Sequence, residues 1–402
     1  LKRGYFPSME ATSAQPDRLR GHWFPLRFLA MSTKYTPPPY TPIVAQLPAS
    51  VPFVGPETQE RKAGQPFRAR LGANENGFGP SPRAIAAMAE AAGHVWKYGD
   101  SESYHLKAAL AAQHGVAAEN ILIGEGIDGL LGYLVRLYIA QGDGVVTSAG
   151  AYPTLNYHVK GFGGEIHAVP YAGDHEDPQA LIAKATETGA KLIYLANPDN
   201  PMGSHHSAEV ITKMIEAVPE GSLLILDEAY VEFAPEGTAP KLDPQDRRVI
   251  RMRTFSKAYA MAGARIGYAI AHPDLIASFD KIRNHFGINA IAQAGALAAL
   301  ADQPWLDHIN AQVARARDEI GRIARMHGLM PLPSATNFVA IDCGADGAFA
   351  RRVLEALGAR GVFVRMPFVA PHDRCIRVSC GPDAELEAFA QALPEALRAA
   401  RG

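Results

Sequence analysis

The feature that most constrains the fold is an alternation of short apolar runs and amphipathic runs between about residue 83 and residue 300. Apolar runs such as ILIG at 121–124, LIYLA at 192–196 and LLIL at 223–226 lack the period-two pattern of a half-exposed strand. Strands buried on both faces of a sheet read as near-continuous apolar runs, and amphipathic helices cover them. The pattern therefore predicts an α/β fold with a mainly parallel sheet between helical layers.

The pattern changes after about residue 303, where one long amphipathic run, WLDHINAQVARARDEIGRIARMHG, predicts a single long helix. The strand-like runs NFVAID and CIRVS and two further helical runs follow it, which predicts a smaller α+β domain. We predict four parts, namely an extended or disordered segment at 1–50, an N-terminal arm with part of the small domain at 51–93, a large cofactor-binding domain at 94–300, and a small C-terminal domain at 301–402.

Composition excludes several classes of protein. The formal net charge of -2 gives no basic field for nucleic acid. No apolar run approaches the roughly 20 residues of a membrane span. The cysteines, Cys343, Cys375 and Cys380, form no CxxC pair, which argues against a disulfide framework or a metal site and favours the cytoplasm.

The first residues leave two interpretations open. Arg18, Arg20 and Arg27 precede a proline-rich run, TPPPYTP, which favours extended backbone. Residues 1–30 could be a targeting segment, but no clean apolar core follows the charges. A natural start at Met31 with an extra upstream tail is the preferred interpretation.

The run TFSKAYAMAGARIGY at 254–268 carries the strongest chemical signal. Lys257 follows a predicted strand, and the carboxyl ends of parallel strands line the ligand crevice of such folds. A buried lysine amine loses its charge readily and can then attack an aldehyde. Thr254, Ser256 and Arg265 could bind a phosphate beside it. The alternative is a surface Ser-Lys pair beside a structural arginine.

Two further strand ends carry polar groups that suit an aromatic cofactor. Asp227 in LLILDEAY could pair with a protonated pyridine nitrogen. Tyr230 of the same run and Asn200 in the turn NPDNPMG could bind a phenolic oxygen of the ring. Taken singly, the aspartate and the tyrosine give only a weak signal, since a capping aspartate and a packed tyrosine are common. An ordinary turn is the preferred interpretation of NPDNPMG on its own.

Two last motifs suit anions. In GEGIDG at 124–129, the backbone amides of Gly126, Ile127 and Asp128 would open a helix whose N-terminus attracts negative charge. In CIRVSCG, Arg377 lies between apolar residues and needs an anionic partner. That partner is either a substrate carboxylate or an internal Asp or Glu.

In their order along roughly residues 50–402, these motifs resemble the histidinol-phosphate aminotransferase family of the fold-type I pyridoxal-phosphate enzymes. ANENGFGPSP at 73–82 and YGD at 98–100 resemble further signatures of that family. The resemblance implies a seven-stranded, mainly parallel sheet, pyridoxal 5′-phosphate as cofactor, and ping-pong transfer of an amino group from an amino acid or similar donor to a 2-oxo acid. It also implies a homodimer with shared active sites.

The resemblance assigns a role to each matching residue. Lys257 holds the cofactor as a Schiff base and, with Asp227 and Tyr230, forms the catalytic set. Tyr98 reaches the cofactor phosphate of the neighbouring subunit. The other implied cofactor contacts are Asn200, Tyr152, Gly126, Ile127, Asp128, Thr254, Ser256 and Arg265, and the implied substrate contacts are Arg377, Arg365, Asn74 and Phe53.

Departures from the family pattern leave the substrate open. Phe53 stands where the family often has a tyrosine that touches substrate phosphate, whereas Arg365 matches an arginine that reaches a distal phosphate. The donor is therefore either histidinol phosphate or a more general amino acid, such as an aromatic one. A decarboxylase or lyase on the same scaffold is the enzymatic alternative. A cofactor-sensing transcription regulator is the non-enzymatic alternative, although residues 1–50 are too short and proline-rich for a helix-turn-helix.

Overall fold

The computed structural model describes residues 37–49 and 54–402. Phe53 and the segment around Met31 lie outside the described residues. Residues Pro42–Gly402 form one compact unit, which carries everything described below. Pro42–Ala45 forms one helical turn, α1, so the prediction of extended backbone up to residue 50 is wrong at these four residues.

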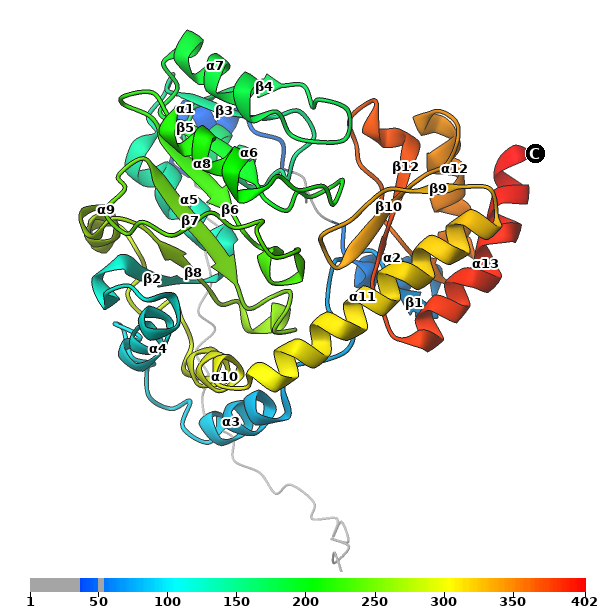
Figure 1. Ribbon diagram of the computed structural model, residues 1–402, viewed down its shortest axis with the longest axis horizontal. Coiled ribbons are helices and arrows are strands. Elements are labelled where there is room, and N and C mark those ends of the chain that lie inside the picture. Colours follow the sequence, from blue (N-terminus) through cyan, green and yellow to red (C-terminus); the bar gives the residue numbers. More distant parts are fainter. Residues whose placement is uncertain (1–36, 50–53) are drawn as a thin grey trace, which may run out of the picture. The chain divides into compact units, whose positions relative to one another are not determined.

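A seven-stranded sheet forms the centre of the larger part of this unit (Figure 1). Its strand order is β2-β8-β7-β6-β5-β3-β4. Strand β8 runs opposite to the other six strands of this sheet, since both β2 and β7 pair with it in the antiparallel direction. This confirms the predicted α/β fold with a mainly parallel sheet. The strands are β2 (Ile121–Gly124), β3 (Gly144–Ser148), β4 (Glu165–Val169), β5 (Leu192–Ala196), β6 (Leu223–Asp227), β7 (Val249–Thr254) and β8 (Gly267–Ile270).

Helices cover both faces of the sheet, which explains its continuous apolar runs. On β6, Ile225 packs with Leu130 of α5 (Gly126–Tyr138) on one face. The next residue toward the N-terminus, Leu224, belongs to the cluster on the opposite face, with α7 (Pro178–Thr188) and α8 (Ala208–Glu216). Successive side chains of a strand point to opposite faces, so both must be apolar when both faces are covered. Helix α6 (Thr154–Gly161) packs against α5.

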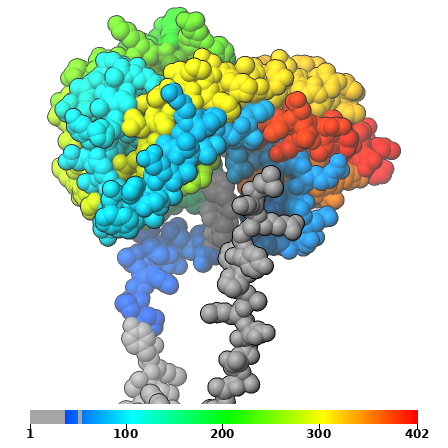
Figure 2. All heavy atoms as spheres, turned by 90° about the horizontal axis from the view of Figure 1, so that it is seen from below, coloured from blue at the N-terminus to red at the C-terminus, as the bar shows by residue number. Residues whose placement is uncertain are grey.

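A further layer of helices lies at the β2 end of the sheet. Helix α10 packs against α3 and α4, and Figure 2 shows the α10–α11 segment in yellow beside the segment that contains α3 and α4 in blue and cyan. The bounds of these helices are α3 (Pro82–Ala92), α4 (Tyr104–His114), α9 (Pro273–Ser278) and α10 (Ala290–Leu300).

The smaller part contains a three-stranded antiparallel sheet, β12-β10-β9, and three long helices. The N-terminal segment joins it, because β1 (Ala69–Arg70) pairs in parallel with β11 (Val362–Phe363). The domain boundaries predicted from the sequence stay predictions. The other elements are α2 (Pro56–Ala63), α11 (Gln303–Met326), β9 (Met330–Pro331), β10 (Phe338–Asp342), α12 (Gly347–Ala359), β12 (Cys375–Ser379) and α13 (Asp383–Arg401).

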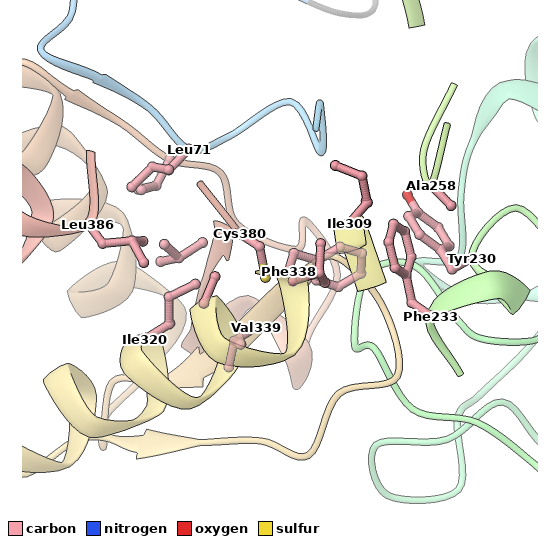
Figure 3. Close-up of a cluster of buried hydrophobic side chains, with 14 of the residues drawn as sticks. Leu71, Tyr230, Phe233, Ala258, Ile309, Ile320, Phe338, Val339, Cys380 and Leu386 are labelled. Carbon is pink, nitrogen blue, oxygen red and sulfur yellow. The ribbon is translucent and has the colours of Figure 1, made fainter. Parts of the chain in front are cut away.

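One continuous apolar cluster joins the two parts (Figure 3). Phe338 of β10 and Ile309 of α11 belong to this cluster together with Tyr230, which follows β6. The rings of Phe338 and Tyr230 meet edge-on with centroids 5.5 Å apart. This packing brings the carboxyl end of β6 close to β10 and β12. Among the described residues, no helix is both long and apolar enough to cross a membrane.

Candidate active site

A cavity of about 550 Å³ opens at the carboxyl ends of the sheet strands, against β12. Most of the residues predicted for the site line it. Gly126 lies at its edge beside Arg265, whereas Tyr98 does not line it. The predicted residues that line the cavity are Asn74, Ile127, Asp128, Tyr152, Asn200, Asp227, Tyr230, Thr254, Ser256, Lys257, Arg265, Arg365 and Arg377.

Lys257 stands three residues beyond the end of β7 and projects into the cavity. Its Nζ donates to the carbonyl oxygen of Asn74 at 3.0 Å, and the side chain of Asn76 donates to the carbonyl of Lys257 at 3.0 Å. Burial lowers the pKa of Lys257 to about 8, and the nearby positive charge of Arg377 acts in the same direction. The amine therefore becomes a neutral nucleophile at a lower pH than the amine of an exposed lysine.

Asp227 ends β6 and is almost fully buried. Its Oδ1 accepts from the backbone N–H of Ala229 at 2.9 Å, and its Oδ2 accepts from the hydroxyl of Tyr194 at 2.7 Å. Burial raises the pKa of Asp227 to about 6, although both hydrogen bonds oppose the shift. The sequence analysis missed Tyr194, which looks like one more apolar strand residue in LIYLA.

The hydroxyl of Tyr230 is held between two asparagines. Asn74 Nδ2 donates to it at 3.1 Å, and Asn200 Nδ2 lies at 3.5 Å. Arg377 Nη1 in turn donates to Asn200 Oδ1. Asn74, predicted as a substrate contact, therefore lies beside Tyr230 and Lys257, at the floor of the cavity.

An anion cradle forms where α5 begins. Arg265 Nη1 lies 3.4 Å from Ser256 Oγ, and its Nη2 lies 3.8 Å from an oxygen of Asp128. Gly126 adopts φ +76°, and a Cβ added there would lie 2.6 Å from Arg265 Nη2, so only glycine lets the backbone approach the guanidinium this closely. Ser256 N donates to Thr254 Oγ1 at 3.0 Å, which fixes the turn after β7. Backbone amides, hydroxyls and a guanidinium converge as a phosphate requires.

Tyr152 provides an aromatic wall of the cavity. It lies two residues before α6, and its hydroxyl donates to Asp128 Oδ1 at 3.2 Å. Burial and the negative charge of Asp128 both raise the pKa of this phenol. Tyr152 is therefore a neutral ring whose orientation is fixed from the N-terminal turn of α5.

Two arginines meet at the small-domain side of the cavity. Arg365 and Arg377 pair as an antiparallel bridge, with N–O distances of 3.2 and 2.6 Å. Burial lowers the pKa of Arg377 to about 10, and within the described part of the chain its buried Nε has no hydrogen-bond partner. A buried N–H group without a hydrogen-bond acceptor costs free energy, and an anion bound there would supply the acceptor. This end of the cavity therefore suits an anionic substrate group.

Tyr98 lies apart from the cavity of its own chain. Its side chain is 81% exposed, and its ring centroid lies 4.8 Å from that of Phe286. A contact with the cofactor of the same chain therefore has no support in the described residues.

A lysine amine of lowered pKa, a buried carboxylate and a phosphate cradle, set at the strand ends of this sheet, define a pyridoxal-phosphate enzyme of fold type I. The residues fit the cofactor on structural grounds, because Gly126 keeps the cradle open and Asp227 retains acceptor positions that face the cavity.

Comparison with known proteins agrees with this class. The profile of the family "Aminotransferase class I and II" matches residues 69–393. The histidinol-phosphate aminotransferase of Anaeromyxobacter sp. (strain Fw109-5) is 36% identical over 89% of this chain and 99% of its own. That of Moorella thermoacetica is 33% identical over 85% of this chain and 88% of its own.

A solved structure gives the same result. The histidinol-phosphate aminotransferase of Sinorhizobium meliloti, crystallised with pyridoxal-5′-phosphate, superposes with a TM-score of 0.87 and is 52% identical, covering 91% of this chain and 99% of that one. The chain belongs to the class I and II aminotransferase family. It is an aminotransferase that uses pyridoxal 5′-phosphate, and no observation favours the decarboxylase or the transcription regulator.

Proposed function

We propose that this aminotransferase takes its amino group from histidinol phosphate and passes it to a 2-oxo acid. The observation that carries the proposal is the pair Arg365 and Arg377, bridged backbone to backbone at one end of the cavity. Histidinol phosphate carries a phosphate ester where an amino acid carries its α-carboxylate, and a phosphate dianion can engage two guanidinium groups. The names of the similar proteins support the same donor.

We infer the following roles for the chain's own groups around the cofactor. Bound pyridoxal phosphate supplies an electron sink for the reacting carbon. Lys257 would hold the cofactor between turnovers. Once displaced by the donor, its amine would take the proton from the substrate Cα and deliver it to the cofactor carbon that had carried the aldehyde. The carboxylate of Asp227 balances the charge of the ring nitrogen. Tyr230, held by Asn74 and Asn200, faces the ring oxygen.

We assign the remaining contacts to the cofactor's phosphate and ring face. Tyr152 packs on the ring, since it forms the aromatic wall of the cavity. The phosphate lies at the N-terminus of α5, where helix dipole and free amides favour an anion. The residues proposed to hold it are Gly126, Ile127, Asp128, Thr254, Ser256 and Arg265.

Two measurements test this function. Borohydride reduction followed by peptide mapping should place a stable cofactor label on Lys257, and Lys257→Ala should bind cofactor without a label and lose turnover. A donor panel of histidinol phosphate, phenylalanine, glutamate and alanine, followed by the loss of cofactor absorbance at fixed enzyme, then identifies the donor. A higher kcat/KM for phenylalanine than for histidinol phosphate would refute the proposed substrate and favour an aromatic amino acid.

We also propose that the enzyme is a homodimer and that Tyr98 completes the partner's site. Aromatic and apolar side chains are exposed around Tyr98, and such a patch marks an interaction surface. Its members include Val95 (61% exposed), Trp96 (81%), Tyr104 (64%) and Phe286 (55%).

Hybrid dimers test the shared site directly. Lys257→Ala and Tyr98→Ala chains should each form dimers with little activity. A mixed dimer holds one site with both Lys257 and a partner's Tyr98, so mixing after mild dissociation should restore activity. A monomer in sedimentation analysis, or mixing that restores nothing, would refute the shared site.

The compartment is inferred from the thiols. Cys343, Cys375 and Cys380 are buried and free. Free cysteines persist in reducing compartments, which supports a cytoplasmic enzyme.

A further inference from the structure

The sheet register places Tyr194 and Asp227 on the same face. Tyr194 lies two residues before Ala196 on β5, and Ala196 pairs with Asp227 of β6. Side chains two apart on a strand share a face, so Tyr194 and Asp227 are diagonal neighbours. A tyrosine side chain is long enough to bridge such a diagonal pair, whereas a serine side chain is too short. The tyrosine hydroxyl accordingly reaches Oδ2 of Asp227 at 2.7 Å.

The hydroxyl of Tyr194 is buried among apolar side chains and hydrogen-bonds to Asp227. Its side chain is fully buried in the apolar cluster between the sheet and α5, with Ile225 and Met252. A buried phenol needs a hydrogen-bond partner, and the partner here is a carboxylate that lines the same cavity. An ionised carboxylate has about four acceptor positions. The bonds from Tyr194 and from the N–H of Ala229 occupy two and leave the others for the cavity.

The charges around Asp227 oppose its ionisation. Burial raises its pKa most, and the negative charges of Asp128 and Glu228 raise it further. The hydrogen bonds from Tyr194 and from Ala229 N lower it, and that from Tyr194 is the larger of these two effects. The other titratable groups that interact with this pair are Glu176, Tyr152 and Tyr230.

We propose that Tyr194 is a positioning residue whose hydroxyl orients the Asp227 carboxylate and keeps it ionised opposite the ring nitrogen of the cofactor. The inference rests on the cofactor site proposed above. Tyr194 acts through Asp227 and makes no contact of its own with the reacting atoms. Its fixed orientation follows from the strand register, so the carboxylate is aligned before the cofactor binds.

The test variant is Tyr194→Phe in the holoenzyme, which removes one oxygen and keeps the ring. We expect kcat to fall about tenfold to a hundredfold, the factor that a hydrogen bond to a charged group contributes, with KM for the donor changed less. Without the tyrosine hydroxyl, Asp227 is less ionised and the ring nitrogen carries less positive charge. The protonated C=N bond between Lys257 and the cofactor then loses its proton at a higher pH. The pH at which the bound cofactor changes its visible absorption should therefore move upward.

Tyr268→Phe is the matched control. Tyr268 is also a buried strand tyrosine, and its hydroxyl lies 3.0 Å from His114 Nε2, away from the cavity. This variant should lose stability in thermal unfolding yet keep the kcat and the absorption titration of the parent. A similar loss of kcat in both variants would show that Tyr194 is merely structural.

A double-mutant cycle completes the test. If Tyr194 acts through Asp227, Tyr194→Phe should change the amino-transfer half-reaction less than twofold once Asp227→Asn has removed the carboxylate. An equal fall in both backgrounds, or an unmoved absorption titration, overturns the proposal. Absence of a borohydride label on Lys257 would instead overturn the cofactor site itself, so the two failures are distinguishable.

Discussion

The guanidinium of Arg377 donates a hydrogen bond to Oδ1 of Asn200 and so joins strand β12 to the turn that follows β5. The amide nitrogen of the same asparagine faces the hydroxyl of Tyr230 at 3.5 Å. One side chain thus connects the arginine of the anion end with the tyrosine at the cofactor end.

The first prediction concerns the guanidinium of Arg377, whose several N–H groups can bond to two partners at once. Arg377→Lys keeps one positive charge but cannot bond to an anion and to Asn200 at once. We expect kcat/KM for the donor to fall at least about a hundredfold, because charge-assisted bonds are lost at a buried site. Steady-state kinetics measures this. Arg360→Lys is the control, since Arg360 contacts Glu395 on the surface at 3.3 Å and should leave kinetics unchanged.

The second prediction separates the two reasons for glycine at position 126. Gly126 and Gly142 both adopt positive φ, +76° and +87°, but an added Cβ meets Arg265 only at Gly126 and nothing within 4 Å at Gly142. Gly126→Ala should weaken cofactor binding at least about tenfold, because the guanidinium must move from the cradle. Gly142→Ala should cost only the backbone strain, about 1 kcal/mol of stability, with unchanged affinity. Titration of the apoenzyme with cofactor measures both, and equal affinities would contradict the steric argument.

The sequence predicted the residues that adjoin an apolar strand. Lys257 and Asp227 could be placed in the crevice because a polar group that follows a buried strand must emerge at the sheet's carboxyl edge. The other contacts in the site depend on how strands and loops pair in the folded chain. Tyr194 meets Asp227 only through the β5–β6 register, and Arg365 meets Arg377 only through a bridge between a loop and β12. Neither relationship leaves a pattern in the linear sequence.

Asn74 is a residue that the sequence identified but whose contacts it could not predict. The motif ANENGFGPSP identified the residue, but its position follows from contacts across the chain. Its backbone N–H donates to Ser379 Oγ at 3.0 Å, and its side chain donates to Tyr230. The sequence motif alone could not show that Asn74 contacts Tyr230 and Lys257, because these residues meet only in the folded chain.

The third prediction concerns the buried ion pair behind the site. Glu228 accepts from Arg251 at 2.5 and 3.0 Å and from Arg253 at 2.9 Å. Burial raises the pKa of Glu228, but the two arginines outweigh it, so the net pKa is lowered. Glu228→Gln leaves buried guanidinium groups uncompensated and should cost about 3–5 kcal/mol in denaturant unfolding.

The lowered pKa of Glu228 also predicts how the free energy of unfolding changes with pH. A carboxylate with a lowered folded-state pKa stabilises the fold above its unfolded value of 4.5, and this stabilisation is lost as pH falls toward the folded pKa. The parent should therefore lose more stability than Glu228→Gln between neutral and acid pH. Glu209→Gln, which breaks an exposed pair with Lys213, is the control and should produce no measurable change. A Glu228→Gln protein as stable as the parent would contradict a structural role for the pair.

The fourth prediction follows from the lowered pKa of Lys257. The folded apoenzyme binds this proton with a pKa of about 8 and the unfolded chain with the ordinary value of 10.5. Below pH 8 both states are charged and the folded state carries the full cost of a buried charge. Between 8 and 10.5 the folded state alone is neutral, so the unfolded chain binds more protons and stability rises with pH. Lys257→Met should thus be more stable than the parent at pH 7, by about 3 kcal/mol, and the advantage should shrink toward pH 10.

The same shift sets the rate at which the cofactor becomes attached. Only the neutral amine attacks the aldehyde, so the rate of covalent attachment to the apoenzyme should rise with pH and level off above about 8. Pyridoxamine phosphate has no aldehyde and reports non-covalent binding alone, so its pH profile should lack this step. Stopped-flow absorbance follows both reactions. A rate of attachment that still climbs through pH 10 would mean that the amine behaves as an ordinary exposed lysine, and burial would then have no part in activating it.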